Sequence, residues 1–227
     1  MAVPVSAARG ETAAARAFRE IRARILSGAL PAGALVLEGE MAVALGLSRT
    51  PVREAMVRLA DEGLVHLRPR HGMQVKPLSA DDMREIYDVL TELEAAAARR
   101  CAERGLDAAT LASLESAVAA MDAALARDDL DAWADADADF HRRLTEASGN
   151  AMLAAVVASF ADRAHRWRMA TLRLRPRPDA SNDDHRAVVA AIRARDPARA
   201  EAIHRAHRAG AGEMLARLLE RLAFAGD

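Results

Sequence analysis

The sequence predicts a mainly α-helical protein made of two unlike domains. The chain of 227 residues is rich in alanine, leucine and arginine, which favour helices, and only 3% of it is aromatic. Segments of strand-like character occur only before residue 77, and no later stretch alternates polar and apolar residues. We therefore expect a small N-terminal domain of helices and a hairpin over residues 12–76. A linker at residues 77–80 would join it to an all-helical bundle over residues 81–224.

Charge and cysteine content narrow the class of protein. The net charge is −1, but residues 1–76 carry four excess positive charges and the remainder five excess negative ones, which indicates that the N-terminal part meets a polyanion. Cys101 is the single cysteine, which excludes an internal disulfide and is typical of a reducing cytoplasm. No apolar run approaches the ~18 residues of a membrane span. We expect a cytoplasmic protein that does not associate with a membrane.

The N-terminal domain begins with three expected helices. The first covers residues 12–27, with Ala17, Ile21 and Ile25 on one apolar stripe, and it ends at Gly28. The second covers residues 38–45 and the third residues 48–62. A short glycine-containing turn, residues 46–47, joins these two. This is the helix-turn-helix arrangement, whose second helix can enter the major groove of DNA.

The start of the third helix carries two arginines on one face. Arg49 and Arg53 are four residues apart, Ser48 is a favourable N-cap residue, and Pro51 suits a first helical turn. A helix N-terminus with clustered arginines attracts phosphate and can place guanidinium groups against guanine edges. Two solvated arginines at an ordinary helix start would show the same pattern, so the flanking chain decides between these interpretations.

The chain after Gly63 changes to strand-like periodicity. Residues 64–68 and 73–75 read as two short strands around a basic tip at residues 69–72. Because an isolated hairpin is marginally stable in water, this one must pack against the helices and form a winged helix-turn-helix. Arg70, His71 and the amide of Gly72 could reach the DNA backbone or minor groove, although a solvent-exposed turn would also carry them. Together the helix and the wing predict DNA binding.

Nearly all of residues 15–76 resemble the GntR superfamily of bacterial transcription regulators. The motif that carries most of this resemblance is Leu47-Ser48-Arg49-Thr50-Pro51-Val52-Arg53-Glu54-Ala55, supported by residues 25–33 and 59–65. The resemblance implies that Arg49 and Arg53 contact bases, that Thr50 contacts the DNA backbone, and that His71 and Gly72 make the wing contact. Many relatives have Arg or Ser just before the Glu of the second helix. This chain has Gly39 there, so the contact made by those relatives is not expected.

The C-terminal part reads as helices throughout. Residues 79–82 resemble a capping box that opens a long helix ended by Gly105. Its apolar stripe comprises Met83, Ile86, Tyr87, Leu90, Leu93 and Ala97. Further helices are expected at residues 107–127, 130–148, 150–172, 182–195 and 197–224, with a loop over residues 173–180 that contains two prolines. These elements predict an all-helical bundle.

Histidines and an aspartate in this bundle have a spacing that suits metal ligands. Asp137 and His141 share one helix face, His185 lies near the start of a later helix, and His207 lies in the middle of the last. Four such ligands from three helices would hold Zn²⁺, Ni²⁺ or Mn²⁺ with open positions for a ligand. Solvated side chains on alanine-rich helices explain the same spacing. Further candidates are His165, His204, Asp135 and Asp139, but only Asp137 stands four residues before His141.

Residues 80–222 resemble the FCD domain, the ligand-binding domain of the FadR subfamily of GntR regulators. The segments that carry the resemblance are Asp137-Ala138-Asp139-Phe140-His141, Ser148-Gly149-Asn150, Asp184-His185-Arg186-Ala187-Val188 and His204-Arg205-Ala206-His207. It implies a metal held by Asp137, His141, His185 and His207, with His204 as a neighbour. It also implies an effector that is a small organic acid, whose carboxylate completes the coordination of the metal.

One departure from that subfamily concerns the effector. Many relatives have an arginine four residues before the glutamate that matches Glu94, and this chain has Leu90. A cation could come instead from Arg163, Arg166 or Arg168, although a solvated helix face explains each of these as well.

The sequence therefore predicts a metabolite-responsive, DNA-binding transcription regulator, a repressor rather than an enzyme. We expect a homodimer formed by the helical domain, and an operator that is an inverted repeat in double-stranded DNA. One alternative is a metal-dependent hydrolase that uses the Asp/His₃ site, against which the sequence shows no additional general base near the ligands. Another is a DNA-binding scaffold whose helical domain binds nothing.

Overall fold

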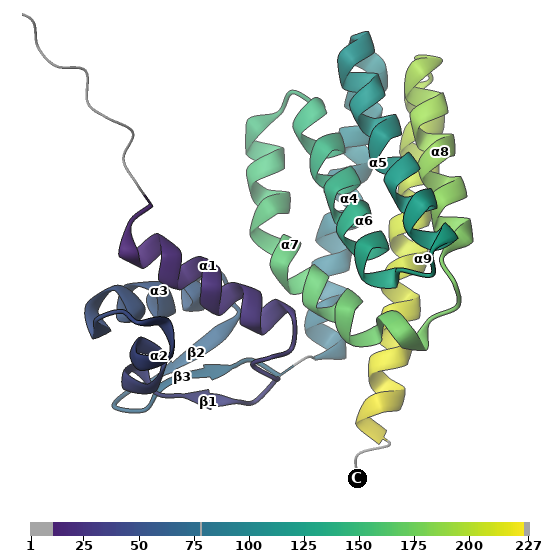
Figure 1. The fold of residues 1–227 in the computed structure, drawn as a ribbon. Coiled ribbons are helices and arrows are strands. Elements are labelled where there is room, and N and C mark those ends of the chain that lie inside the picture. Colours follow the sequence, from purple (N-terminus) through teal and green to yellow (C-terminus); the bar gives the residue numbers. More distant parts are fainter. Residues whose placement is uncertain (1–10, 78, 225–227) are drawn as a thin grey trace, which may run out of the picture. The chain divides into compact units, whose positions relative to one another are not determined.

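The computed structural model describes residues 11–77 and 79–224 and divides into two compact units, Met1–Pro77 and Leu78–Asp227. The first unit contains three helices and a small sheet, and the second contains helices only in its described part (Figure 1). The mainly α-helical class, with a winged helix-turn-helix followed by a helical bundle, is confirmed. Leu78, in the expected linker, lies outside the described residues, and Ala80 already belongs to the first helix of the bundle.

The first unit, here called the winged unit, follows the order of elements that the sequence predicts, with one addition. Its elements are α1 (Ala13–Leu26), β1 (Leu35–Val36), α2 (Glu38–Leu45), α3 (Arg49–Asp61), β2 (Val65–Arg68) and β3 (Gly72–Val75). The sheet is antiparallel with the order β1-β3-β2. The unexpected strand β1 is two residues long, too short to show any periodicity in sequence. It ties the β2–β3 hairpin to the chain that leads into α2.

The core of the winged unit fixes the orientation of α3. One face of α3 is buried through Val52, Ala55, Met56 and Leu59, and α3 packs against α1. Full burial of a large apolar side chain is worth roughly 1.5–3 kcal/mol, so this face holds the helix firmly. Helix α2 ends at Gly46, which begins the turn into α3 and whose φ of 62° is left-handed and favours glycine. The opposite face of α3 is left exposed to solvent.

The second unit, here called the bundle unit, consists of helices that run side by side (Figure 1). They are α4 (Ala80–Arg104), α5 (Ala108–Ala126), α6 (Leu130–Ala147), α7 (Ala151–Thr171), the 3₁₀ turn η1 (Leu172–Leu174), α8 (Asp179–Arg193) and α9 (Pro197–Phe224). Helix α4 packs against α9, and α5 packs against α6 and α8. Capping side chains start most of these helices by accepting a backbone amide three residues later, namely Ser79, Asp107, Asp129, Asn150 and Asp196.

The start of α8 differs from the sequence prediction. The helix begins at Asp179, not at residue 182, and η1 occupies part of the expected loop. Pro178 stands at the N-cap position, where its missing amide costs nothing. Asn182 lies inside the helix and is buried. Its side chain accepts a hydrogen bond from Trp133 Nε1 (2.9 Å) and donates one to Asp122 (2.7 Å), so it joins α8 to α5 and α6.

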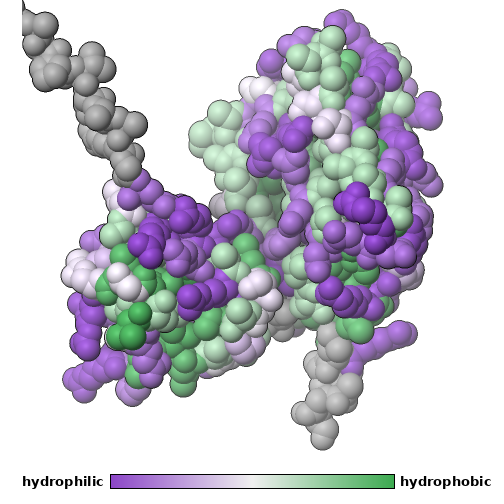
Figure 2. Space-filling model, viewed as in Figure 1, coloured by the Kyte–Doolittle hydropathy of each residue, from purple (hydrophilic) through white to green (hydrophobic). Residues whose placement is uncertain are grey.

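Helix α5 corrects the expectation that no segment is long and apolar enough to cross a membrane. Its length and composition pass that test, with a mean hydropathy of 1.3 over the best window. Core helices of soluble proteins pass the same test, and Leu114, Met121 and Leu125 of α5 are buried in the bundle core. Figure 2 shows hydrophilic residues interspersed with mildly hydrophobic ones over the visible face of the bundle unit. The composition of α5 is therefore weak evidence for a membrane span.

Candidate functional site

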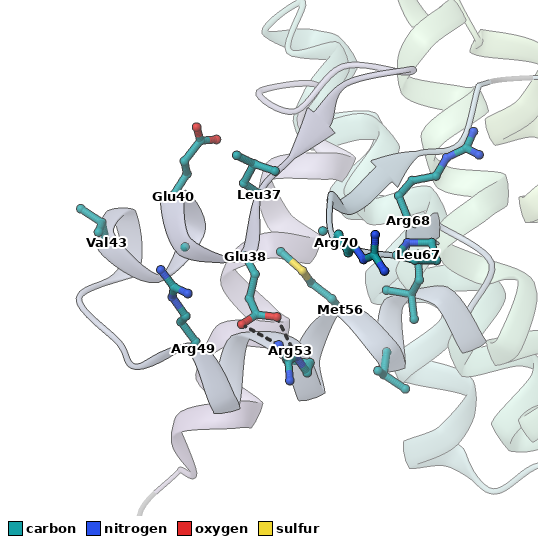
Figure 3. A pocket seen from close by; sticks show the side chains of 14 residues that line it. Leu37, Glu38, Glu40, Val43, Arg49, Arg53, Met56, Leu67, Arg68 and Arg70 are labelled. Atoms are coloured by element: carbon teal, nitrogen blue, oxygen red, sulfur yellow. Dashed lines mark hydrogen bonds and ion pairs between the residues drawn. The ribbon is translucent and has the colours of Figure 1, made fainter.

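A basic groove runs between the start of α3 and the wing of the winged unit (Figure 3). It encloses about 1120 Å³. Its lining includes Glu38, Gly39 and Glu40 of α2, Arg49 and Arg53 of α3, and Arg68, Arg70 and Gly72 of the wing. Four guanidinium groups from two elements therefore border one concave surface, which suits a polyanion.

Arg53 is held above this groove by an ion pair with the first residue of α2. Its Nε lies 2.7 Å from Glu38 Oε2, and its Nη2 lies 3.3 Å from Oε1 (Figure 3). The Arg53 side chain is 73% exposed and that of Glu38 is 19% exposed. Exposed ion pairs of this kind are worth roughly 0–1 kcal/mol. The contact orients the guanidinium while leaving it free to exchange Glu38 for a DNA group.

Arg49 lies against Gly39, the position at which this chain departs from many relatives. A Cβ atom placed on Gly39 would lie 3.3 Å from Arg49 Nη2, which is tight. The absence of a side chain on Gly39 thus gives the Arg49 guanidinium its place beside α2. Ser48 occupies the N-cap position of α3 as expected, but among the described residues its side chain makes no capping hydrogen bond.

The wing tip has a backbone that only certain residues adopt. Arg70 has a φ of 66° and Gly72 a φ of 75°, and His71 Nδ1 lies 2.9 Å from the carbonyl oxygen of Pro69. A Cβ atom on Gly72 would lie 2.1 Å from the carbonyl oxygen of Val36 in β1. Gly72 is therefore required for the close approach of β1 and β3, whatever it contributes to DNA binding.

The bundle unit brings the four sequence-predicted metal ligands together. Each of Asp137, His141, His185 and His207 offers one ligand atom, and these atoms all lie within 4.8 Å of one another. Nε2 of His141 lies 3.4 Å from Nε2 of His185, and each of these atoms lies 3.6 Å from Asp137 Oδ1. Four atoms placed tetrahedrally about 2.1 Å from a metal would be separated by about 3.4 Å. The spacing of these three atoms fits that arrangement.

Carboxylates lie behind two of these imidazoles. Nδ1 of His207 lies 3.2 Å from Asp184 Oδ2, and Nδ1 of His141 lies 2.7 Å from Glu94 Oε2. Hydrogen-bonded partners fix the tautomer and orientation of metal-ligating histidines. The His207–Asp184 contact is such a hydrogen bond, whereas Glu94 lies close to His141 Nδ1 without the alignment of one. Glu94 is also within 3.1 Å of His204 Nε2 and of Arg208 Nη2. The sequence prediction assigned Glu94 no role and treated His204 only as a neighbour.

Burial dominates the protonation of this cluster. Burial alone would raise the pKa of Asp137, but the nearby His141, Arg168 and His185 outweigh it and hold that pKa well below its usual range. Burial lowers the pKa of His185 well below its usual range. For His141 burial is opposed by Glu94, and the net result is a raised pKa. These shifts favour an ionised Asp137 and a neutral His185, the forms that ligate a metal, while the raised pKa of His141 means that a metal there would compete with a proton.

A cavity of about 310 Å³ opens beside Asp137, His141 and His207. Four arginines line it: Arg168 of α7, Arg175 and Arg177 of the loop before α8, and Arg208 of α9. Arg168 was one of three alternatives expected from sequence, and its Nη1 lies 3.4 Å from Asp137 Oδ2. Arg175 and Arg208 were not expected. Leu90, which stands where many relatives have arginine, is buried in the core of the bundle unit.

Two family models match the chain, "Bacterial regulatory proteins, gntR family" over residues 13–75 and "FCD domain" over residues 85–210. The chain belongs to the GntR family. This GntR-family regulator is 45% identical over 130 residues to an uncharacterized HTH-type transcriptional regulator in the TAR-I ttuE-ttuC' intergenic region of Agrobacterium vitis, an alignment that covers 56% of this chain and 76% of that relative. It is 32% identical over 129 residues to the HTH-type transcriptional repressor RspR of Escherichia coli, covering 57% of this chain and 56% of RspR.

The fold of the GntR-family regulator also matches solved structures. Escherichia coli McbR/YncC superposes with a TM-score of 0.78 at 20% identity, covering 91% of this chain and 98% of that one. At this identity the likeness concerns the fold alone. Family members are DNA-binding transcription regulators, and none of these relatives supports the hydrolase alternative. A hydrolase would need a general base near the metal ligands, and Glu94 is a carboxylate beside His141 that the sequence did not point to. Arg208 and His204 already engage the Glu94 carboxylate.

The structure gathers most, but not all, of the residues predicted for the two sites of this GntR-family regulator. Arg49, Arg53 and Gly72 line the groove, whereas Thr50 and His71 are exposed outside its lining. The Asp137 cluster is complete. Arg175 and Arg208 could not be placed from sequence, because nothing in their local spacing relates them to that cluster.

Proposed function

We propose that this GntR-family protein is a repressor whose helical unit binds a divalent metal and a small organic acid. The observation that carries the proposal is the convergence of Asp137, His141, His185 and His207 beside a cavity lined by arginines. A bound Zn²⁺, Ni²⁺ or Mn²⁺ ion would supply a Lewis acid to which an effector carboxylate can bind. The Asp184 and Glu94 carboxylates would hold two of the ligating imidazoles in orientation.

A second group of residues, Glu94, His141 and His204, also has ligand atoms close together. It is the weaker candidate because Arg208 Nη2 lies 3.1 Å from Glu94 Oε1, and a fixed guanidinium at that distance opposes binding of a second cation. Burial also lowers the pKa of His204 to about 4, so His204 is a neutral ring that donates its Nε2–H to the Glu94 carboxylate. We assign Glu94 and His204 to the support of His141.

The winged unit would read the operator. Arg49 and Arg53 would contact base edges in the major groove, with Thr50 on the DNA backbone and His71 and Gly72 at the groove edge beside the wing. We propose that the helical unit forms a homodimer in the cytoplasm. Its twofold symmetry would present two copies of α3 to an inverted repeat in double-stranded DNA. The relative RspR is named a transcriptional repressor, which supports the proposal that this protein represses transcription.

Effector binding would weaken DNA binding and so relieve repression. An effector can change DNA affinity only if it favours one arrangement of the two winged units over another. The separation of the groove and the arginine-lined cavity into two units supports a mechanism of this kind.

The metal content of purified protein tests the metal half of the proposal. Elemental analysis should find about one divalent ion per chain, and His185→Ala and His207→Ala should each lose it. His204→Gln is the matched control, because it removes a buried histidine of the alternative group and should keep the metal. Loss of metal from His204→Gln with retention in His185→Ala would assign the ion to the other group. Absence of metal from every preparation, after incubation with each of the three ions, would refute this half.

A further inference from the structure

The four arginines of the cavity differ in how their charges are matched. Arg177 pairs with Asp128 and Asp179. Arg208 is paired with Glu94, 3.1 Å away, and its guanidinium lies 4.7 Å from the ring centre of Tyr87. Arg168 is buried, shares Asp137 at 3.4 Å, and its Nε has no hydrogen-bond partner among the described residues. Arg175 donates a hydrogen bond to the carbonyl oxygen of Arg168 (3.2 Å), and no carboxylate pairs with it in the part of the chain that the structure describes.

Arg175 is therefore a partly buried cation that forms no ion pair with a carboxylate among the described residues, and the more distant charge of Asp137 compensates it only in part. Its guanidinium lies 5.8 Å from the ring centre of Trp133, and burial lowers its pKa. A charge removed from water is costly unless an opposite charge compensates it. The loop that carries Arg175 is fixed in place by Arg177. The Arg177 side chain donates a hydrogen bond to the Leu125 carbonyl oxygen (2.7 Å) and pairs with Asp179. The fold thus holds Arg175 at the cavity with a hydrogen bond to the Arg168 carbonyl oxygen and with further N–H donors available to a ligand.

Metal binding would enlarge this positive excess. Asp137 is the one carboxylate that pairs with Arg168 among the described residues, and a ligated ion would take most of its charge. The ion would bring two positive charges, and Arg168 and Arg175 one each. Together these would exceed the two negative charges of Asp137 and Asp184 by two. Asp184 is half exposed and therefore screened by solvent. A ligand with a single carboxylate would leave this excess partly unbalanced.

We propose that the effector is a dianion, a small dicarboxylic acid, and that Arg175 together with Arg168 binds its second carboxylate. This inference rests on the proposed function, which places the first carboxylate at the metal ligands. Guanidinium groups bind carboxylates through paired, charge-assisted hydrogen bonds. The cavity volume of about 310 Å³ lies at the low end of the roughly 300–1,000 Å³ of ligand pockets, which fits a diacid of few carbons. Gly210 keeps the α9 wall open, since a Cβ there would meet no described atom within 4 Å.

Matched pairs of acids test the second carboxylate. Malate and 2-hydroxybutyrate differ only in a carboxylate that replaces a methyl group, and 2-hydroxyglutarate and 2-hydroxyvalerate form a pair one carbon longer. Each would be titrated by calorimetry into the full-length, nickel-loaded protein, whose nickel content is measured first. In at least one pair the diacid should bind roughly tenfold to a hundredfold more tightly than the monoacid. Arg175→Gln should remove that advantage without loss of nickel.

Arg173→Gln is the control for this variant. Arg173 stands two residues earlier in the chain, is 69% exposed, pairs with Asp131 and does not line the cavity, so the diacid preference should persist. Equal binding of diacid and monoacid in both pairs would overturn the dianion inference and leave a metal-dependent, monocarboxylate-responsive regulator standing. Binding of none of the four acids to nickel-loaded protein would also overturn it. Failure to load nickel is seen before any acid is added, and it counts against the proposed metal site.

Discussion

At the scale of single residues, Glu94 organises the polar centre of the bundle unit. Its buried carboxylate contacts His141, His204 and Arg208, residues from two other helices. Burial alone would raise the pKa of Glu94, but the charges of Arg208 and His141 outweigh that effect and lower the pKa well below its usual range. An acidic residue on the core-facing stripe of an alanine-rich helix is a sequence signal that could have indicated this role. Its partners could not be predicted, because they lie far away in the chain on other helices, His204 and Arg208 more than a hundred residues later.

Replacement of Glu94 should weaken metal binding more than it changes the fold. Glu94→Gln keeps the shape of the side chain but removes the charge that orients His141, and loss of such a partner typically costs about 10–100-fold in metal affinity. Competition with a chelator of known affinity measures this change, and circular dichroism verifies the fold. Glu92→Gln is the control, because Glu92 is 65% exposed and pairs only with Arg205 on the surface. Equal affinities of the Glu94→Gln and wild-type proteins would show that Glu94 does not act on the site.

Arg53 is the residue whose replacement best tests base reading. Arg53→Ala should cost roughly 1–3 kcal/mol of operator binding and relax base preference at one position, if its guanidinium contacts guanine. Glu38→Gln should strengthen DNA binding slightly, since the Arg53 guanidinium would no longer have to leave a carboxylate 2.7 Å away. Both effects are measured by gel shift with an operator obtained by selection from random DNA. A loss in Arg53→Ala that is equal on all sequences would mark Arg53 as a phosphate contact.

At the scale of elements, capping residues made the helix starts predictable from sequence, whereas the sheet was not fully predictable because strand β1 is so short. Side chains such as Ser79, Asn150 and Asp196 accept amides at the helix starts, as their positions in sequence indicate. Strand β1 has no sequence signal, because two residues cannot show alternation and their pairing with β3 is set by tertiary contact. The early start of α8 was missed for a similar reason. Asn182 is a residue type that favours helix starts, but it lies inside α8, and its side-chain amide bonds to α5 and α6.

The junction of β1 and β3 gives a prediction at this scale. Gly72→Ala should destabilise the winged unit by about 2–4 kcal/mol, because the new Cβ would meet the Val36 carbonyl at 2.1 Å in addition to the strain of a φ of 75°. Gly28→Ala is the matched control. Gly28 has a φ of 79°, but a Cβ there meets no described atom within 4 Å, so only the strain of about 1 kcal/mol applies. Urea unfolding of both variants separates the two costs, and equal losses would contradict the structural role of Gly72.

At the scale of the whole molecule, the sequence predicted the two units and the Asp137 cluster better than the ligand cavity. Asp137 and His141 are neighbours on one helix, so their spacing alone was informative. The arginines of the cavity come from α7, α9 and the loop before α8, and only the packing of these elements brings them together. The proposed specificity for an effector would depend on these later contacts. The class of regulator can thus be inferred from local motifs, whereas its ligand requires the assembled bundle.

The proposed coupling between the two units would have a consequence that binding measurements can check from either side. If an effector lowers the affinity of the protein for its operator by some factor, the operator must lower the affinity for the effector by the same factor. We expect a factor of about 5–150, the usual range of such coupling. The diacid of the more tightly bound pair would be titrated into nickel-loaded protein with and without the selected operator, and the operator would be titrated with and without the diacid. Arg175→Gln should keep its operator affinity but lose the response to the diacid. A diacid affinity that the operator leaves unchanged would show that the cavity does not control the winged units.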